Sequence, residues 1–360
     1  MIGRALAGMV LALCLTGGAT AQPVIEASES FGDPQAAAVM LVRATTDIDL
    51  FDEVLDGFVT ANPDIRIDYE QWGSNDLFKQ SQQDCLSGRF SADMVISSAV
   101  DQQVKLVNDG CARPYRSAQT ASLPDEFQWR SELFGITREP AVMVYNRELV
   151  PEAEAPRTRF DLVDLLRPED SRFAGMVATY DIEESGLGYL FAFVDAQQAT
   201  SFGSLAEAFA QSGAVSTCCS TEIIDGVASG RYLLAYNVLG SYALAQAERS
   251  PNLAIVVPQD YALILSRGAL IPRRARNPAA AGRFLDYLLS PAGRAIMARS
   301  HLYVDVTDGD ASGLDVPAAN DSILRPIPLS PVLLVGLDKE KRAHFLSFWR
   351  DTFAGATSSD

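Results

Sequence analysis

The chain has 360 residues, of which 48% are hydrophobic and 21% are charged, and its formal net charge at pH 7 is −17. This composition is typical of a folded globular protein, and the length favours two lobes over one small core. Because a strongly acidic protein repels the phosphate backbone, the charge argues against a nucleic-acid partner. It does not exclude an anionic ligand, since a few local arginines and amide groups can outweigh the mean field of the protein.

The first 21 residues, MIGRALAGMVLALCLTGGATA, have the pattern of a secretory signal peptide. Arg4 supplies a short basic segment, residues 9–15 form an apolar stretch too short to cross a bilayer, and the final ATA is a small-x-small cleavage motif. Leu13 before Cys14 departs from a lipobox, so simple cleavage is expected. The sequence therefore predicts an exported, periplasmic protein.

Four cysteines follow the predicted cleavage site. Cys85 and Cys111 each come at the end of a predicted helix, and an exported chain permits disulfides, so we predict a bridge between them. The adjacent Cys218 and Cys219 are compatible with either a strained ring or two free thiols, and the sequence leaves both open. Histidines are few and lie far from the cysteines, so no metal site and no cofactor are predicted.

The first part of the mature chain alternates strand and helix patterns, which is typical of a parallel α/β lobe. The expected elements, alternating strand and helix, cover residues 38–45, 49–63, 65–72, 76–88, 92–99 and 99–110. Polar side chains follow two of these strands, namely Thr45 and Thr46 after the first and Ser97 and Ser98 in the third. Ligands of such lobes bind beyond the carboxyl ends of the strands, so these hydroxyls are candidate contacts.

The second part begins with an extended stretch at residues 133–149 and continues as a second α/β lobe. A second extended stretch at residues 253–272 leads back, and residues 277–297 are predicted to form one amphipathic helix. The chain order is therefore lobe, crossover, second lobe and return crossover.

The stretch AYNVLGSYALA, residues 235–245, places small and polar residues between apolar ones. We interpret residues 233–236 as a strand, residues 237–241 as its polar carboxyl end, and Tyr242 as the start of a helix. Ser185 and Gly186 occupy a similar elbow in VATYDIEESGLGYLF. Free amides at a helix start attract anions, and glycine allows close approach of a ligand, although ordinary helix capping explains each elbow equally well.

Several phrases resemble type II periplasmic solute-binding proteins of ABC transporters, near the ferric-iron-binding branch. VYNRELV and NPAAAGRFLDYLLSPAGRAIM carry the general resemblance. VATYDIEESGLGYLFA, YNVLGSYALA and DYALILSRGALIP are similar to the subgroup that includes the phosphoglycerate transport regulatory binding protein. In that subgroup the binding protein can inform a membrane sensor kinase as well as serve a permease.

The resemblance implies a two-lobed Venus-flytrap fold with Rossmann-like lobes joined by crossover strands. Lobe one would comprise residues 38–136 and 266–303, and lobe two residues 139–264 and 304–360. The ligand would bind in the cleft between the lobes, and the partner would be an ABC permease or a sensor kinase. A monomer is expected.

We therefore predict a non-catalytic binding protein for a small phosphorylated or carboxylated anion. Arg267 in the return crossover would contact the anion through its planar fork, with a hinge salt bridge as the alternative reading. Ferric iron or a ferric chelate is the alternative ligand, for an ABC importer, although the adjacent tyrosine pair of ferric binders is missing. The predicted contacts are Thr45, Thr46, Trp72, Ser97, Ser98, Tyr180, Ser185, Gly186, Asn237, Gly240, Ser241, Tyr242 and Arg267.

Two further sequence patterns, one around Ser241 and one at residues 273–276, do not indicate an additional function. Ser241 lies in LGSYA, which lacks the second glycine of a nucleophile elbow and has no suitably placed histidine, so an enzyme is not predicted. The basic run RRAR at residues 273–276 is expected to be a solvated patch on the surface of lobe one.

Overall fold

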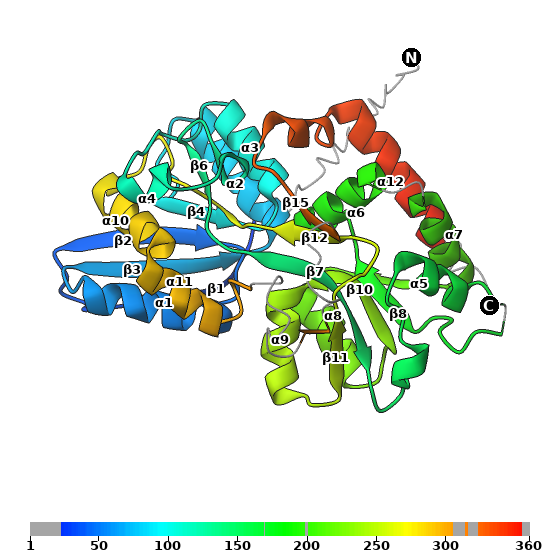
Figure 1. Ribbon diagram of the computed structural model, residues 1–360. Coiled ribbons are helices and arrows are strands. Elements are labelled where there is room, and N and C mark those ends of the chain that lie inside the picture. The colour runs from blue at the N-terminus through cyan, green and yellow to red at the C-terminus, as the bar shows by residue number, and fades with distance from the viewer. Residues whose placement is uncertain (1–22, 169, 199–200, 305–313, 316–322, 355–360) are drawn as a thin grey trace, which may run out of the picture.

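The computed structural model describes residues 23–168, 170–198, 201–304, 314–315 and 323–354, so the predicted signal peptide lies outside the described residues. Within these ranges the strands form two sheets, and helices pack on both faces of each sheet (Figure 1). The predicted two-lobed α/β fold is confirmed. Among the described residues, no helix combines the length and apolarity that crossing a membrane requires.

Lobe one is built on a seven-stranded sheet of order β1-β3-β2-β4-β13-β6-β5, in which β2 pairs in parallel with both β3 and β4. Its strands are β1 (Ile25–Phe31), β2 (Ala38–Ala44), β3 (Ile65–Trp72), β4 (Met94–Ser97), β5 (Gln128–Trp129), β6 (Leu133–Gly135) and β13 (Gly268–Leu270). Its helices are α1 (Ile48–Ala61), α2 (Ser74–Leu86), α3 (Val100–Asn108), α4 (Ala118–Ala121), η1 (Asp125–Phe127), α10 (Pro278–Leu289) and α11 (Pro291–Arg299).

Lobe two is built on an eight-stranded sheet with the path β14-β11-β7-β10-β8-β9, to which β12 and β15 are added beside β7. Its strands are β7 (Glu139–Asn146), β8 (Val177–Tyr180), β9 (Val215–Thr217), β10 (Leu234–Leu239), β11 (Leu253–Val256), β12 (Ala262–Leu265), β14 (Leu314–Asp315) and β15 (Leu324–Pro326). The remaining helices are η2 (Glu152–Glu154), α5 (Arg159–Leu166), α6 (Gly186–Gln198), α7 (Phe202–Ser212), α8 (Ser220–Ala228), α9 (Gly240–Arg249), η4 (Pro331–Val335) and α12 (Lys339–Ala354).

The lobes are joined where β6 leads into β7 and where β12 leads into β13 (Figure 1). These two crossovers run beside each other, because β7 pairs with β12 and the Ile136 N–H donates to the Arg267 carbonyl at 3.0 Å. Arg138 extends the connection by donating its N–H to the Leu302 carbonyl at 3.0 Å. Paired backbone of this kind forms a short hinge between two larger bodies.

The apolar pattern of the chain accounts for the core of lobe one. In α1, Phe51, Val54 and Phe58 recur at helical spacing and are buried, and the helix ends before Asn62 and Pro63. Phe58 packs edge-on against Phe284 of α10, with ring centroids 4.9 Å apart. The predicted strand and helix sequence of this lobe is confirmed, with the ends shifted by a few residues.

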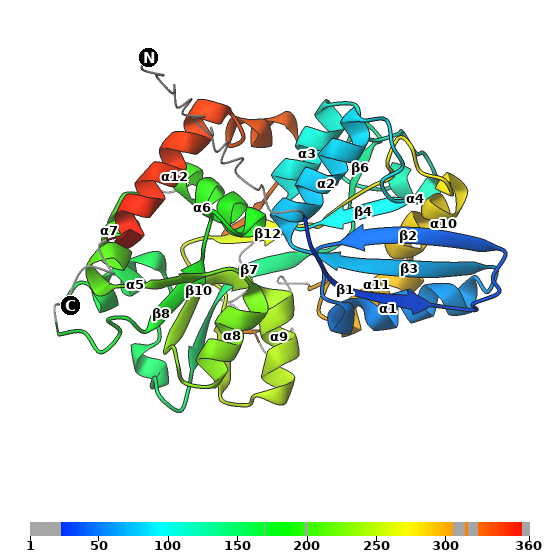
Figure 2. The ribbon, with the colours of Figure 1, turned by 180° about the vertical axis from the view of Figure 1, so that it is seen from behind.

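Two elements of lobe one differ from the prediction. The single helix expected at residues 277–297 is broken into α10 and α11, because Ser290 adopts an extended conformation and Pro291 begins the next helix. The strand β1 was not predicted at all. It pairs antiparallel with β3 at the edge of the sheet (Figure 2), and all but its last residue are exposed, so no apolar alternation reveals it.

Both cysteine pairs are bridged. The predicted bond between Cys85 and Cys111 is confirmed and links the last turn of α2 to the segment after α3. Cys218 and Cys219, which the sequence left open, form a vicinal disulfide immediately before α8. The two bridges lie in different lobes, and only the vicinal pair borders the cleft described next.

Candidate functional site

A cavity of about 570 Å³ lies between the two lobes. Lobe one lines it with the ends of β2, β3 and β4, and lobe two lines it with the starts of α6, α8 and α9. We call this cavity the interlobe cleft. It is formed by the strand-to-helix elbows that the sequence singled out in both lobes, which is where α/β folds place their ligands.

The strand ends of lobe one bring two predicted hydroxyls together. Thr45 and Ser98 both line the cleft, and their hydroxyl oxygens are 3.2 Å apart. The N–H of Ser98 also donates to the Thr45 hydroxyl at 3.0 Å. Trp72, at the end of β3, lines the same wall with its indole N–H donating to Glu70 at 3.1 Å.

The neighbouring predicted hydroxyls have other partners and do not line the cleft. The Thr46 hydroxyl accepts a hydrogen bond from Arg267 at 2.8 Å, and its carbonyl accepts one from the Tyr69 hydroxyl at 2.7 Å. The Ser97 hydroxyl accepts the Ala99 N–H at 3.1 Å. Alternate residues of a strand point to opposite faces, so adjacent polar residues at its end face different surroundings.

Lobe two contributes three of the predicted side chains to the cleft. The Tyr180 hydroxyl lies 2.6 Å from the Ser220 hydroxyl at the start of α8. The Ser185 hydroxyl accepts the Gly188 N–H at 3.0 Å, so it caps the first turn of α6 as well as facing the cleft. Tyr242 reaches across the cleft and donates to Asp47 at 2.9 Å.

The first residues of the AYNVLGSYALA stretch are directed away from the cleft. Asn237 lies within β10, at a register irregularity and with a positive φ of 63°, and its amide donates to Asp195 at 3.2 Å. Gly240 begins α9 against Pro140, where a Cβ would lie 2.9 Å from the proline Cγ. The Ser241 hydroxyl is fully buried and donates to Glu139. The predicted helix start at Tyr242 is therefore wrong by two residues. The strand continues through the irregularity to Leu239, and α9 begins directly after it at Gly240, so no separate polar segment lies between them.

Arg267 borders the cleft, but its fork is directed into the hinge. Its Nε and Nη2 donate to the two carboxylate oxygens of Glu139 at 2.9 and 3.1 Å, and both residues are buried. Glu139 also accepts hydrogen bonds from Ser241 and Thr137. We call Thr46, Thr137, Glu139, Ser241 and Arg267 the hinge network. The alternative reading of Arg267 as a hinge salt bridge thus matches its geometry.

Gly186 forms a different contact between the lobes. Its N–H, at the start of α6, donates to the Ser74 hydroxyl of lobe one at 2.9 Å. Next to it, the Asn75 amide donates to the Glu183 and Glu184 carbonyls, each at 2.9 Å. These bonds close one side of the cleft.

Four helix starts around the cleft share one property. The N-cap positions of α1, α3, α8 and α9 make no side-chain capping hydrogen bond. Residues at these starts, Asp47, Ser98, Cys219 and Leu239, line the cleft. The first amides of a helix lack partners within the helix and carry partial positive charge, so such starts can receive acceptor oxygens. At α1 the Ile48 N–H already donates to the Gln71 side chain at 3.1 Å.

Sequence reasoning missed the carboxylates of the cleft. Five acidic residues and two arginines line it, and in the described part of the chain none of the five acids is in an ion pair. Asp47 directly follows the predicted Thr45 and Thr46, so its position was a usable signal, whereas the others come together only in the fold. These acids are Glu26, Asp47, Glu184, Glu222 and Asp225, beside Arg231 and Arg267.

Burial raises the pKa values of one carboxyl group and two phenol groups that line the cleft. Burial raises the pKa of the Glu26 carboxyl, and the nearby charges of Asp47 and Asp76 add to this shift, against a hydrogen bond from Gln71. Burial, followed by the charge of Asp47, raises the pKa of Tyr242 well above its usual value. Burial also raises the pKa of Tyr180 to about 12. The two phenols are therefore neutral donors at neutral pH.

Within the described residues, no group of three or more histidine, cysteine or acidic side chains is placed to hold a metal ion. Tyr236, which precedes the elbow, is buried and donates its hydroxyl to Asp195. It therefore does not join Tyr242 in the cleft.

The comparisons with known proteins agree with this architecture. The family model described as bacterial extracellular solute-binding protein matches residues 91–326. A substrate-binding protein of an ABC transporter from Agrobacterium tumefaciens is 34% identical, with 92% of this chain and 100% of that chain covered and a TM-score of 0.84. A comparison with curated protein sequences finds no match.

More distant solved structures share the fold. AfuA from Actinobacillus pleuropneumoniae, with exogenous fructose-6-phosphate bound, is 16% identical, covering 89% of this chain and 99% of its own at a TM-score of 0.68. Iron-bound HitA from Pseudomonas aeruginosa is 16% identical, covering 88% and 99% at a TM-score of 0.64. The matched family and the solved relative from Agrobacterium establish that this chain belongs to the bacterial extracellular solute-binding proteins, the periplasmic binding components of ABC transporters.

Proposed function

We propose that this protein captures a small phosphorylated or carboxylated solute in the interlobe cleft, without transforming it. The observation that carries the proposal is that helix starts whose N-cap side chains make no capping hydrogen bond meet at one cavity. The starts of α3 and α8 carry most of the argument, since the Ile48 N–H of α1 donates to Gln71 at 3.1 Å and the first residues of α9 face the hinge. Amides at helix starts favour anionic oxygens both by hydrogen bonding and through the helix dipole. The exported location predicted from the sequence fits capture of an external solute.

The hydroxyls of both lobes would complete the contacts to such an anion. Thr45 and Ser98 supply donors from lobe one, and Tyr180, Ser220 and Thr221 supply them from lobe two. A ligand held from both sides stabilises the closed arrangement of the lobes, which is how a two-lobed binder reports occupancy.

The acidic residues of the cleft restrict which chemical groups the solute can carry besides its phosphate or carboxylate. Glu26, Asp47 and Glu184 would repel a second acidic group, because no cation pairs with them in the described residues. They accept hydrogen bonds readily, so we infer that the remainder of the ligand bears hydroxyl or ammonium groups. Arg267 would then act mainly by holding the hinge, and Arg231 is the cation of the cleft that is not committed to the hinge network.

Ferric iron is the less favoured ligand. Phenolate ligands require Tyr242 or Tyr180 to lose a proton, and burial raises the pKa of both phenols. The second tyrosine of a ferric pair would have to come from elsewhere, since the Tyr236 hydroxyl is bonded to Asp195.

The solute would be passed to an ABC permease or, as the resemblance to the phosphoglycerate regulatory subgroup implies, signalled to a membrane sensor kinase. The two outcomes differ in their readout. Ligand-loaded protein should stimulate ATP hydrolysis by a reconstituted importer in the first case, and autophosphorylation of a reconstituted kinase in the second.

Native mass spectrometry of freshly purified protein tests the proposal directly. We expect a retained solute of acidic character, recovered chemically unchanged. Phosphorylated three-carbon acids should raise the melting temperature, and ferric iron without a chelating anion should not. A red-brown protein with a tyrosinate charge-transfer band would overturn the anion proposal in favour of iron.

Ser98 allows a matched test of the cleft. We expect Ser98→Ala to weaken binding of the retained solute by about 1 kcal/mol, or several-fold, because one donor is removed. Ser97→Ala is the control, since the Ser97 hydroxyl accepts a backbone N–H and does not line the cleft. Calorimetric titration that shows equal affinities for both variants would place the ligand away from the strand ends of lobe one.

A further inference from the structure

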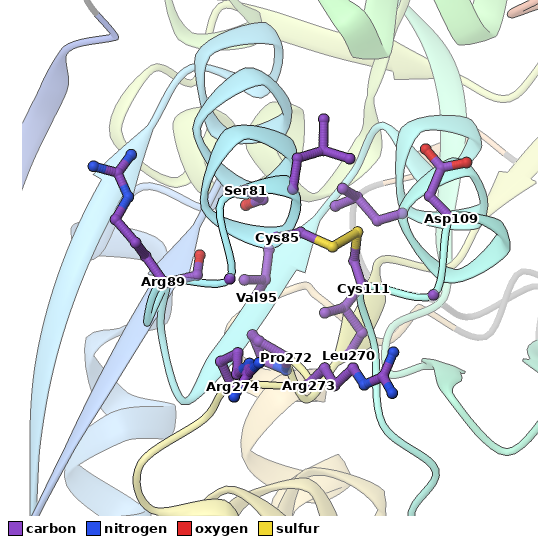
Figure 3. Close-up of a pocket in the computed structure, with 15 residues that line it drawn as sticks. Ser81, Cys85, Arg89, Val95, Asp109, Cys111, Leu270, Pro272, Arg273 and Arg274 are labelled. Carbon is purple, nitrogen blue, oxygen red and sulfur yellow. A yellow bond between two sulfur atoms is a disulfide. The ribbon is translucent and has the colours of Figure 1, made fainter.

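A second cavity of about 570 Å³ lies in lobe one and shares no lining residue with the interlobe cleft. It is bounded by the end of α2, the end of α3 and the segment after β13, with the Cys85–Cys111 disulfide in its wall (Figure 3). We call it the disulfide pocket. Its volume is in the range of small-molecule sites.

The disulfide pocket is basic in a protein of net charge −17. Arg89, Arg273 and Arg274 line it, and its single acid, Asp109, is paired with Lys105. Arg89 is 3.5 Å from Asp84, whereas no ion pair joins Arg273 or Arg274 to the described residues. Figure 3 shows Arg273 and Arg274 along one side of the pocket and Arg89 on another.

Two buried hydroxyls of the pocket lack hydrogen-bond partners. Ser81 is 5% exposed and Ser91 is 6% exposed, and both line the pocket. Among the residues that the structure describes, neither hydroxyl oxygen has a hydrogen-bond partner. Buried polar groups are nearly always bonded, and leaving one unpaired costs about 1–3 kcal/mol. Each hydroxyl oxygen is itself enclosed, so a ligand with acceptor oxygens would give it a partner after a small shift of the pocket wall.

The arginines also sit on a fixed scaffold. The Arg273 N–H donates to the Cys111 carbonyl at 2.7 Å, so the disulfide and the arginine segment are joined through one residue. The bridge itself fixes the end of α2 against the segment after α3. The scaffold thus fixes the backbone of Arg273, while the exposed guanidinium groups of Arg273 and Arg274 are free to turn toward a ligand. Guanidinium groups suit phosphate and carboxylate, whose paired oxygens match the planar fork.

We propose that the disulfide pocket is a second anion-binding site, which takes a small molecule bearing a phosphate or carboxylate group. The run RRAR, expected from the sequence to be a plain solvated patch, thus contributes two of its arginines to a defined pocket. Its third arginine, Arg276, lies instead over the ring of Phe90 at 4.0 Å from the centroid.

The test is a titration of the full-length protein at low ionic strength with inorganic phosphate and, separately, citrate. Because the interlobe cleft is also proposed to bind an anion, the readout must be local. We expect the backbone amide signals of Gly88, Gly110 and Arg273 to shift and saturate with at least one probe. Tighter binding of phosphate would indicate a phosphoryl ligand, and tighter binding of citrate a carboxylate ligand.

The double variant Arg273→Ala/Arg274→Ala should weaken this binding at least tenfold. The matched control, Arg167→Ala/Arg299→Ala, removes the same charge from two exposed arginines outside the pocket. Ser91→Ala should bind several-fold more weakly while its melting temperature without the probe stays the same or rises, which separates ligand contact from structural damage. Equal loss in the two double variants, or unshifted amides at saturating probe, would overturn the proposal, whatever the interlobe cleft binds.

Discussion

At the scale of single residues, burial decides what a charged side chain can do. Arg267 has the guanidinium fork that an anion would favour, yet its fork is bonded to Glu139 and its remaining Nη donates to Thr46. The pair is buried and fully surrounded by the hinge network. The guanidinium charge of Arg267 is therefore neutralised by Glu139 within the hinge. Removal of one partner would leave the other as an uncompensated buried charge.

We expect Arg267→Ala to lower the free energy of unfolding by about 3–5 kcal/mol, because Glu139 would be left charged and buried. The double variant Arg267→Met/Glu139→Gln should recover most of this loss, since neither charge remains. Urea unfolding of both proteins measures the difference. Normal stability of Arg267→Ala together with weak binding of the solute would show that Arg267 contacts the ligand.

Asp101 of α3 predicts a dependence of stability on pH. Burial raises the pKa of this carboxyl from 3.8 to about 7, against opposing hydrogen bonds from backbone amides and the charge of Arg342. Between these two values the folded state retains a proton that the unfolded state has lost, so stability falls as the pH rises. Asp101→Asn should flatten this dependence and be more stable than the wild type at pH 8 by on the order of 2 kcal/mol.

Thermal unfolding from pH 4 to pH 8 measures this effect. Asp56→Asn serves as the control, because it makes the same substitution at an exposed position on α1. A wild-type profile that rises through the same interval would contradict the predicted ionisation of Asp101.

At the scale of elements, the junctions between strands and helices position the cleft. Each of β2, β4, β8 and β10 leads into a helix whose first turn faces the other lobe or the hinge. The junction of β10 and α9 is tightly constrained, because β10 carries the irregularity at Asn237 and α9 starts against Pro140. Close contact of this kind requires a residue without a side chain.

We expect Gly240→Ala to destabilise the protein by about 1–3 kcal/mol, since the added Cβ would lie 2.9 Å from Pro140 Cγ and 3.0 Å from its carbonyl oxygen. Gly203→Ala in α7 is the matched control, because a Cβ there meets nothing within 4 Å. Alanine should stabilise that helix by about 0.5–1 kcal/mol. Differential scanning calorimetry would contradict the packing argument if the two variants shifted the melting temperature in the same direction.

At the scale of the whole molecule, a small number of polar contacts hold the lobes together across the cleft. Asp47 of lobe one accepts hydrogen bonds from Tyr242 at 2.9 Å and Thr221 at 3.1 Å, both from lobe two. A second set of hydrogen bonds between the lobes joins Ser74 and Asn75 of lobe one to the start of α6 in lobe two. The closed arrangement therefore rests in part on side chains that also border the ligand space, namely Asp47, Ser74, Thr221 and Tyr242, beside apolar packing of α3 against α6. Occupancy and closure are coupled through the cleft residues.

Tyr242→Phe should shift the ligand-free protein toward an open form, because Asp47 loses one of its two side-chain donors from lobe two. We expect a larger radius of gyration by small-angle scattering and a several-fold weaker affinity for the retained solute. Tyr115→Phe is the control, since Tyr115 donates to Asp286 within lobe one. An unchanged radius together with unchanged affinity would mean that this contact does not control closure.

The sequence alone determined the features that depend on neighbours along the chain. The apolar spacing of α1, the buried strands and the ends of α2 and α3 are local patterns, so the α/β alternation and the Cys85–Cys111 bridge were predicted correctly. Strand ends that precede helices also marked Thr45, Ser98 and Ser185, which the fold gathers in one cleft.

Only the tertiary structure decided which of those side chains face the cleft and which face the hinge. Ser241 and Arg267 both bond to Glu139, which lies far from them in the sequence, so no local pattern reveals their partner. The five carboxylates of the cleft and the unpaired serines of the disulfide pocket likewise come from separate segments. The reason is physical: periodicity fixes whether a residue is buried, whereas its charge partner depends on how distant segments pack.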